Sequence, residues 1–102
     1  MENLLSIHKK EIAKLCEIFK VKRMYVFGSI TSKKFNEDSD IDFLISFSED
    51  ITLQEYSDNY FELHYKLKEV LNREVDIITE KSLKNPFFIE SINNNKRLIY
   101  EA

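Results

Sequence analysis

The only glycine of this chain stands at the end of a short apolar run. Gly28 is the single glycine among 102 residues, and it follows the run from Arg23 to Phe27. Globular proteins contain roughly 7% glycine, so its one position needs a reason. Glycine is favoured where the backbone takes a positive φ or where another group comes close to the main chain. Gly28 therefore indicates either a simple turn after a strand or a backbone that a ligand must approach.

The rest of the chain alternates between helical and strand patterns. Apolar residues recur at helical spacing over 4–20 and 52–71, and Thr52 with Glu55 predicts a capping box at the start of the second helix. Leu53 is expected on the apolar face of that helix. Residues 40–47, 73–79 and 97–100 are further predicted strands, and Asn85-Pro86 predicts a helix that runs to about Ile92. This alternation predicts an α/β (α+β) fold, with one sheet of about four strands flanked by helices in a single domain, 1–102.

Composition and charge exclude several classes of protein. The net charge of −3 argues against a broad DNA-binding surface, so we expect no direct DNA binding. No stretch approaches the ~20 apolar residues of a membrane span, and no membrane association is expected. The one cysteine, Cys16, cannot form an internal disulfide and is expected to be buried. These features indicate a cytoplasmic protein, with His8 and His64 on its surface.

Two aspartates open the second predicted strand. Side chains alternate along a strand, so Asp40 and Asp42 are expected to point the same way, with Cα atoms roughly 6.5–7 Å apart. Such a pair can bind hard cations that prefer oxygen ligands, or it can simply be a solvated strand face. Gly28 and Ser29 are expected to begin a short helix, and the free N–H groups of a helix start bind phosphate well. Together these residues predict a phosphate site beside a metal site.

A third carboxylate lies within an apolar run. In the sequence E-V-D-I-I-T, Asp76 is expected to point outward while Val75 and Ile77 point into the core. It could pair with Arg73 or with a lysine. If its strand neighbours the strand over 40–47, the carboxylate of Asp76 could instead join the other two aspartates.

The motif resembles that of a known superfamily. Gly28-Ser29, ten further residues and then Asp40-Ile41-Asp42 resemble the G-S-x10-D-x-D signature of the polymerase-β nucleotidyltransferases. The short length, the R-E-V-D-I-I-T strand and the ending N-N-N-K-R-L-I-Y-E-A are similar to the minimal nucleotidyltransferases. The resemblance implies the nucleotidyltransferase fold, with a small mixed sheet. It also implies that Gly28 and Ser29 hold the β- and γ-phosphates, that Asp40 and Asp42 bind two Mg²⁺ ions, and that Asp76 binds the catalytic metal and helps to activate the attacking hydroxyl.

The segment after the motif departs from the family pattern. Many relatives carry an arginine and a second glycine shortly after the Gly-Ser pair, whereas this chain reads I-T-S-K-K. Lys33 or Lys34 could supply the missing positive charge, although a lysine lacks the bidentate fork of arginine. Both lysines could equally lie on a solvated helix surface.

The resemblance implies a reaction and a partner. In this family an acceptor hydroxyl attacks the α-phosphorus of a nucleoside triphosphate, here ATP, and pyrophosphate leaves. Minimal members are commonly paired with a HEPN-domain protein, which they adenylylate on tyrosine. The resemblance therefore predicts an Mg²⁺-dependent protein adenylyltransferase, acting as antitoxin of a HEPN ribonuclease toxin in a possible hetero-oligomer. The alternatives are a non-catalytic antitoxin that covers its partner and a small-molecule nucleotidyltransferase completed by a separate acceptor-binding subunit.

Overall fold

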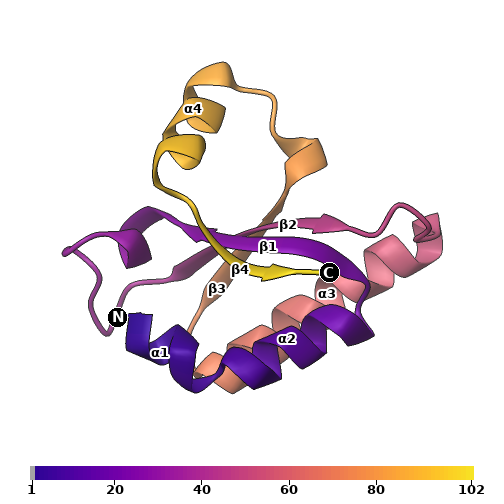
Figure 1. Cartoon of the computed structure of the whole chain (residues 1–102), viewed down its shortest axis with the longest axis horizontal. Helices are drawn as coiled ribbons and strands as arrows, with labels where there is room; N and C mark the ends of the chain where they lie inside the picture. The colour runs from indigo at the N-terminus through magenta and orange to yellow at the C-terminus, as the bar shows by residue number, and fades with distance from the viewer. Residues whose placement is uncertain (1) are drawn as a thin grey trace.

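The fold is a four-stranded mixed sheet with helices on both faces. The computed structural model describes residues 2–102, and Figure 1 shows the arrangement of the elements. In chain order they are α1 (Glu2–Ile7), α2 (Lys9–Ile18), β1 (Val21–Phe27), the 3₁₀ helix η1 (Gly28–Thr31), β2 (Ile41–Phe47), α3 (Leu53–Leu71), β3 (Val75–Thr79), the 3₁₀ helix η2 (Glu80–Ser82), α4 (Pro86–Asn95) and β4 (Arg97–Glu101).

The strand order within residues 2–102 is β3-β2-β1-β4. β1 is antiparallel to both β2 and β4, whereas β2 and β3 are parallel. The predicted fold class, a small mixed sheet of about four strands flanked by helices, is confirmed. β3 and β4 form the two edges, and β3 places the predicted third carboxylate at one of them.

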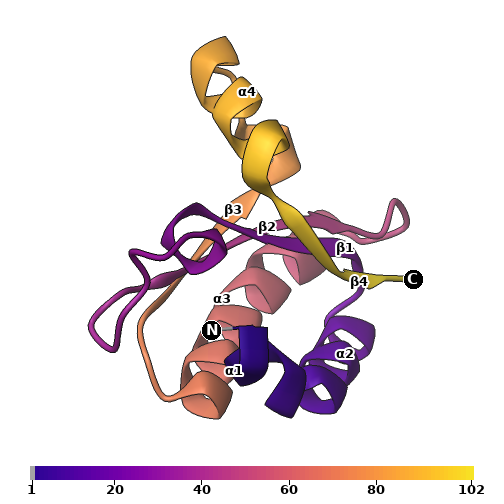
Figure 2. The ribbon, with the colours of Figure 1, turned by 60° about the vertical axis from the view of Figure 1, so that its left-hand side comes forward.

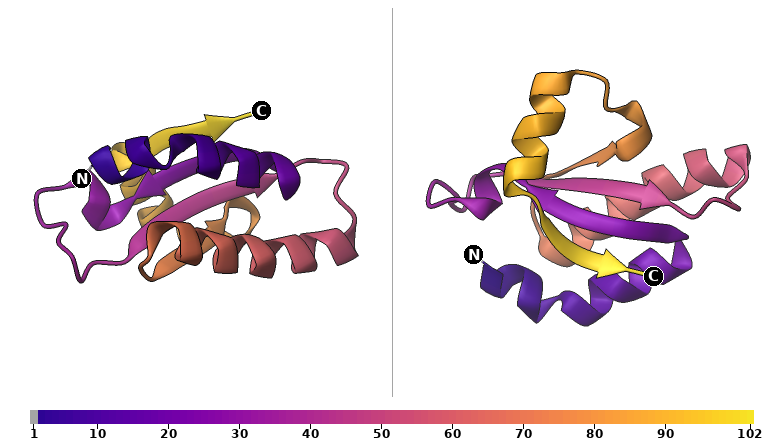
Figure 3. Two further views of the ribbon diagram at one scale, coloured as in Figure 1. Left: turned by 90° about the horizontal axis from the view of Figure 1, so that it is seen from below. Right: turned by 45° about the horizontal axis from the view of Figure 1, so that its top comes forward.

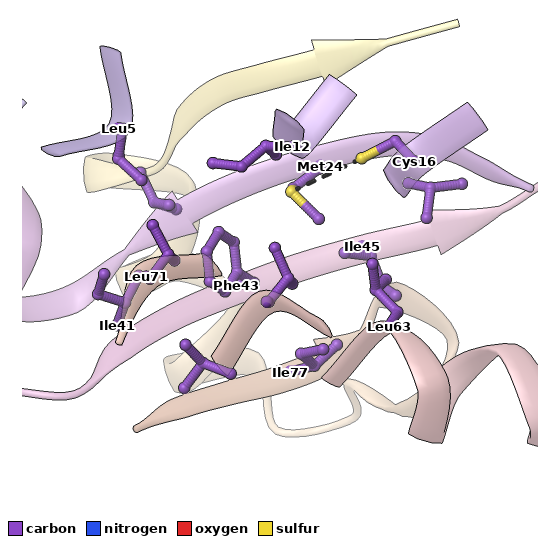
Figure 4. Packing of buried hydrophobic residues seen from close by; sticks show 14 of the residues in the cluster. Leu5, Ile12, Cys16, Met24, Ile41, Phe43, Ile45, Leu63, Leu71 and Ile77 are labelled. Atoms are coloured by element: carbon purple, nitrogen blue, oxygen red, sulfur yellow. Dashed lines mark hydrogen bonds between the residues drawn. The ribbon is translucent and has the colours of Figure 1, made fainter. Parts of the chain in front are cut away.

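One face of the sheet, here called the α2/α3 face, carries most of the core. α2 and α3 lie side by side across it (Figure 3). Figure 4 shows side chains from both helices meeting those of the strands, among them Ile12, Phe43 and Leu63, each fully buried. Cys16 is buried here as predicted, with its Sγ 3.9 Å from the Sδ of Met24. Burial raises the pKa of the Cys16 thiol to about 12, so this cysteine is a core residue and not a nucleophile.

The single helix predicted over 4–20 is wrong, because the chain breaks it at His8. α1 ends at Ile7 and α2 begins at Lys9, and the two helices meet at an angle (Figure 2). This bend follows the sheet, so that Leu5 of α1 and Ile12 of α2 both reach the core. The ring of His8 is only partly covered and lies 3.0 Å from the Glu11 carboxylate.

The start of α3 is held by the capping box that the sequence predicts. The Thr52 hydroxyl accepts from the Glu55 N–H at 3.1 Å, and the Glu55 carboxylate accepts from the Thr52 N–H at 3.1 Å. Lys20, just before β1, forms a 2.8 Å ion pair with Glu55. Leu53 was expected on the apolar face of α3, and that prediction is wrong: the side chain is 88% exposed, because the first turn of α3 lies past the end of the sheet (Figure 1).

The opposite face, here called the α4 face, has a much smaller core. Phe27, Leu44 and Ile92 are its buried residues, and Phe27 meets Phe88 of α4 edge-to-face with ring centroids 6.2 Å apart. α4 projects away from the sheet (Figure 2). Its start agrees with the prediction, because the Asn85 side chain accepts hydrogen bonds from two backbone N–H groups and proline follows it. This face therefore leaves part of the sheet accessible.

Candidate active site

Asp42 and Asp76 lie side by side on the α4 face. The parallel register of β2 and β3 makes these two residues direct partners. Phe43 and Ile77, the next residue on each strand, are buried in the opposite face, so alternation along the strands turns both carboxylates toward α4. The prediction that Asp76 points outward is confirmed, and its strand does neighbour the strand of Asp42, the condition on which the sequence left the meeting of the two carboxylates open.

Asp40 lies one residue before β2, not within the strand as predicted. It is exposed, and β2 begins at Ile41, whose N–H donates to the Glu74 carbonyl at 3.2 Å. Within residues 2–102, no three histidine, cysteine, aspartate or glutamate side chains come together as a metal-binding set. The structure thus brings two of the three predicted carboxylates together and places Asp40 beside them.

The carboxyl group of Asp42 is electrostatically strained. Its pKa is raised to about 6, first by burial, then by the negative charges of Asp76 and Asp40 and by a hydrogen bond with the carboxyl group of Asp76. Crowded carboxylates repel one another when both are ionised, and a cation relieves that repulsion. Their oxygens are the donors that Mg²⁺ prefers, and Mg²⁺ is usually held by one or two carboxylates together with substrate phosphates. The residues present therefore fit such an ion when a nucleotide completes its ligands.

Gly28 follows β1 directly beside these carboxylates. Its φ is +77°, and a Cβ at this position would lie 2.5 Å from Oδ2 of Asp42. Of the two alternatives that the sequence offers for this glycine, the structure shows the turn, and the approach of a ligand stays a prediction. Sequence reasoning missed that the Asp42 carboxylate occupies the space where a side chain at Gly28 would begin. The pairing of Phe27 with Asp42 across β1 and β2 brings the two together.

The segment after Gly28 forms one short helical turn. Ser29 lies within η1 and is half-buried, and the Thr31 hydroxyl donates to the Gly28 carbonyl at 2.7 Å. The short helix predicted at this point is confirmed as a 3₁₀ turn. Lys33 and Lys34 follow it in an exposed turn, so the alternative that places them on a helix surface is wrong, although their side chains are solvated.

Arg73 holds the loop that leads to the aspartates. The sequence offered Arg73 as one possible ion-pair partner of Asp76. In the structure its Nη1 instead donates to the carbonyls of Asn36 and Ser39, at 3.1 and 3.0 Å. Its guanidinium also lies 4.7 Å from the ring centroid of Phe35. Arg73 therefore ties the loop before Asp40 to the start of β3, a role for which the sequence carries no local signal.

Two residues of α3 contact the strand that carries Asp76. The Tyr60 hydroxyl donates to the Ile77 carbonyl at 2.7 Å, and Nε2 of His64 lies 2.8 Å from the Val75 carbonyl. Burial, and after it the charge of Asp76, raises the pKa of the Tyr60 phenol. The surface position predicted for His64 is wrong, because its ring is half-buried against β3.

Residues 8–99 match a family model described as a nucleotidyltransferase domain. The chain belongs to this family. The family resemblance and the enzyme class predicted from the sequence are confirmed. Among the described residues, no helix is both long and apolar enough to cross a membrane.

Individual proteins agree with the family assignment. A candidate protein adenylyltransferase of Methanocaldococcus jannaschii is 38% identical over 100 residues, which cover 98% of this chain and 93% of the relative. A solved candidate minimal nucleotidyltransferase is 30% identical with a TM-score of 0.71, over 91% of this chain and 90% of the other. A chain from the complex of a tri-AMPylated Shewanella oneidensis HEPN toxin with an MNT antitoxin has a TM-score of 0.65 at 19% identity, over 95% of this chain and 72% of the other. At that identity the last likeness concerns the fold alone.

Proposed function

We propose that this protein is an Mg²⁺-dependent adenylyltransferase that transfers AMP from ATP to a HEPN-domain toxin and thereby acts as its antitoxin. The observation that carries the proposal is the direct pairing of Asp42 with Asp76 across β2 and β3, beside Gly28. The adenylyltransferase name of the M. jannaschii relative and the AMPylated toxin of the S. oneidensis complex support the choice of AMP and of a HEPN partner. We propose a single domain over 1–102 that acts in the cytoplasm, in a hetero-oligomer with the toxin.

The phosphate site is proposed at the turn after β1. There the backbone N–H groups of Gly28 and Ser29, both half-buried, would hold the β- and γ-phosphates of ATP. Lys33, four residues after Ser29 in an exposed turn, is the proposed source of positive charge. A lysine contributes a point charge without the bidentate geometry of arginine, so this contact adds affinity more than it fixes orientation.

The metal site is proposed at Asp40, Asp42 and Asp76. Bound Mg²⁺ would stabilise the charge that develops on the α-phosphate and lower the pKa of the acceptor hydroxyl. In the transfer, the acceptor oxygen forms a bond to the α-phosphorus, the bond from that phosphorus to the pyrophosphate oxygen breaks, and the hydroxyl proton passes to the carboxylate of Asp76. Asp76 suits this role because it is exposed on an edge strand, where a protein hydroxyl can reach it.

The decisive experiment is mass spectrometry of a HEPN-domain protein from the same genome, co-expressed with this chain. The parent is expected to add AMP to its partner and to restore growth. Asp42→Asn and Asp76→Asn should each reduce the transfer by roughly 100-fold or more, because metal sites supply several kcal/mol of transition-state stabilisation. Asp38→Asn is the matched control, since it removes a neighbouring exposed charge and should leave the transfer unchanged.

Two outcomes would overturn the proposal. Restored growth with Asp42→Asn and an unmodified partner would show that the chain neutralises the toxin by covering it. AMP transfer by the parent to a small molecule, with none to the HEPN protein, would show that another subunit supplies the acceptor.

A further inference from the structure

We propose that Tyr60 and His64 are positioning residues that hold Asp76 in its reactive place by binding the two backbone carbonyls on either side of it. This inference rests on the proposed role of Asp76. The Tyr60 hydroxyl binds the carbonyl of Ile77, the residue after Asp76, at 2.7 Å. Nε2 of His64 binds the carbonyl of Val75, the residue before it, at 2.8 Å. A carbonyl can only accept, so Nε2 is the protonated ring nitrogen.

Both carbonyls lie on the outer side of the sheet. β3 is an edge strand, with β2 on one side only. The Glu74 carbonyl accepts from Ile41 of β2, so it points into the sheet. Because backbone groups alternate in direction along a strand, the carbonyls of Val75 and Ile77 point away from β2. Among residues 2–102 no strand is available to bind them there, and α3 does so instead.

The spacing on the helix matches the spacing on the strand. Tyr60 and His64 are four residues apart on α3, which corresponds to a rise of about 6 Å. Val75 and Ile77 are two residues apart on β3, which corresponds to about 6.6 Å. α3 and β3 run in opposite directions, so the later helix residue meets the earlier strand residue. Leu63 and Leu67, on the same helix, are fully buried and fix the helix that carries the two donors.

The consequence concerns the precision of the site. Asp76 is exposed on an edge strand, where the ladder holds the backbone from one side only. Displacement of a reacting group by about 1 Å can cost roughly 100-fold in rate. The bonds from Tyr60 and His64 restrain the peptide units on both sides of Asp76. They also cover the polar edge, which protects it from pairing with another strand.

The chain contains a matched control for these two bonds. The Ser82 hydroxyl donates to the Thr79 carbonyl at 2.8 Å, so it makes the same kind of bond to the same strand. Thr79 lies three residues from Asp76, at the far end of β3. Loss of this bond should disturb the strand without displacing Asp76.

The test compares Tyr60→Phe, His64→Leu and Ser82→Ala in AMP transfer to the co-expressed HEPN protein. Each of the first two variants is expected to lower kcat about tenfold, the equivalent of one lost hydrogen bond near the upper end of the usual range. The KM for ATP should stay within about twofold, because Asp76 acts on the acceptor side. Ser82→Ala should change kcat by less than about twofold. His64→Gln retains a side-chain N–H donor and should recover most of the loss.

A double variant separates positioning from general stability. Tyr60→Phe should lower kcat no further in an Asp76→Asn background, while its effect on the melting temperature should persist there. An unchanged kcat in Tyr60→Phe, or an equal loss in Ser82→Ala, would overturn the proposal. Backbone hydrogen exchange provides a readout that does not depend on transfer: exchange within 75–79 should accelerate around Asp76 in Tyr60→Phe and His64→Leu but not in Ser82→Ala. If the parent transfers no AMP, the proposed function fails, whereas unchanged exchange in those two variants overturns the positioning role.

Discussion

The two faces of the sheet use neighbouring residues of the same strands for opposite purposes. On β2 and β3, Phe43 and Ile77 are buried beneath α2 and α3, whereas Asp42 and Asp76 face α4. The α2/α3 face has an extended apolar core, while the α4 face buries only a small cluster around Phe27. The comparison shows that core residues and proposed catalytic residues are separated by a single step along a strand. Substitutions on the first face should therefore affect folding, and those on the second should affect chemistry.

The largest expected effect on stability comes from the α2/α3 face. Ile77 is 5% exposed within the main core, and Ile77→Ala should lower the free energy of unfolding by about 2–5 kcal/mol. Ile78, the next residue, is half-buried on the α4 face, and Ile78→Ala should cost about 1 kcal/mol because less apolar surface is lost. Urea denaturation of both variants measures the difference. Equal losses would show that the two faces are packed equally well.

The next effect concerns the one backbone position where the α4 face requires glycine. Gly28→Ala should lower the free energy of unfolding by about 1–3 kcal/mol because φ is positive at this residue. The added methyl group would also meet the Asp42 carboxylate. Gly28→Ala combined with Asp42→Ala should therefore be less destabilised than the sum of the single variants. Strict additivity in thermal or urea unfolding would show that the contact with Asp42 contributes nothing.

A smaller effect should appear as a pH dependence at the start of α3. The pKa of Glu55 is lowered to about 2, first by its hydrogen bond with Lys20 and then by those with Thr52. A carboxyl group with a lower pKa in the folded state stabilises the protein above its unfolded pKa, and this contribution is lost as the pH falls from about 4.5 toward 2. The parent should therefore lose its stability advantage over Glu55→Gln across this range. A constant difference in melting temperature from pH 5 to pH 2.5 would contradict the assignment.

The smallest effect on stability is expected for Asp42→Asn, although this variant should strongly reduce AMP transfer. Asp42→Asn keeps the shape of the side chain and removes a charge whose pKa is raised first by burial and then by the crowding with Asp76 and Asp40. Without metal, in the presence of a chelator at pH 7, the free energy of unfolding should be unchanged or higher than in the parent. A clear loss of stability in urea, similar to that of Ile77→Ala, would show that Asp42 is structural and would remove the contrast between the two faces.

Much of the fold follows from local rules that can be applied to the sequence. The capping box at Thr52 and the Asn85-Pro86 start of α4 each depend on a few neighbouring residues, and both form as predicted. The turn at Gly28, one of two alternatives for that glycine, also forms. The outward direction of Asp76 depends only on the alternation of side chains along a strand. Three further features also follow from residue type and local pattern. They are the order of the elements, the burial of Cys16 and the match of the chain to its family.

The tertiary structure decided how these parts meet. The bend at His8 and the exposure of Leu53 depend on where the sheet lies, which no local pattern specifies. Three sets of contacts join residues that are 11 to 37 positions apart: Asp42 with Gly28, Arg73 with the loop before Asp40, and α3 with β3. The sequence by itself determined which groups are proposed to carry the chemistry, because that proposal depends on residue type and local spacing. Their distances, burial and charge interactions arise only when the strands pair and the helices pack.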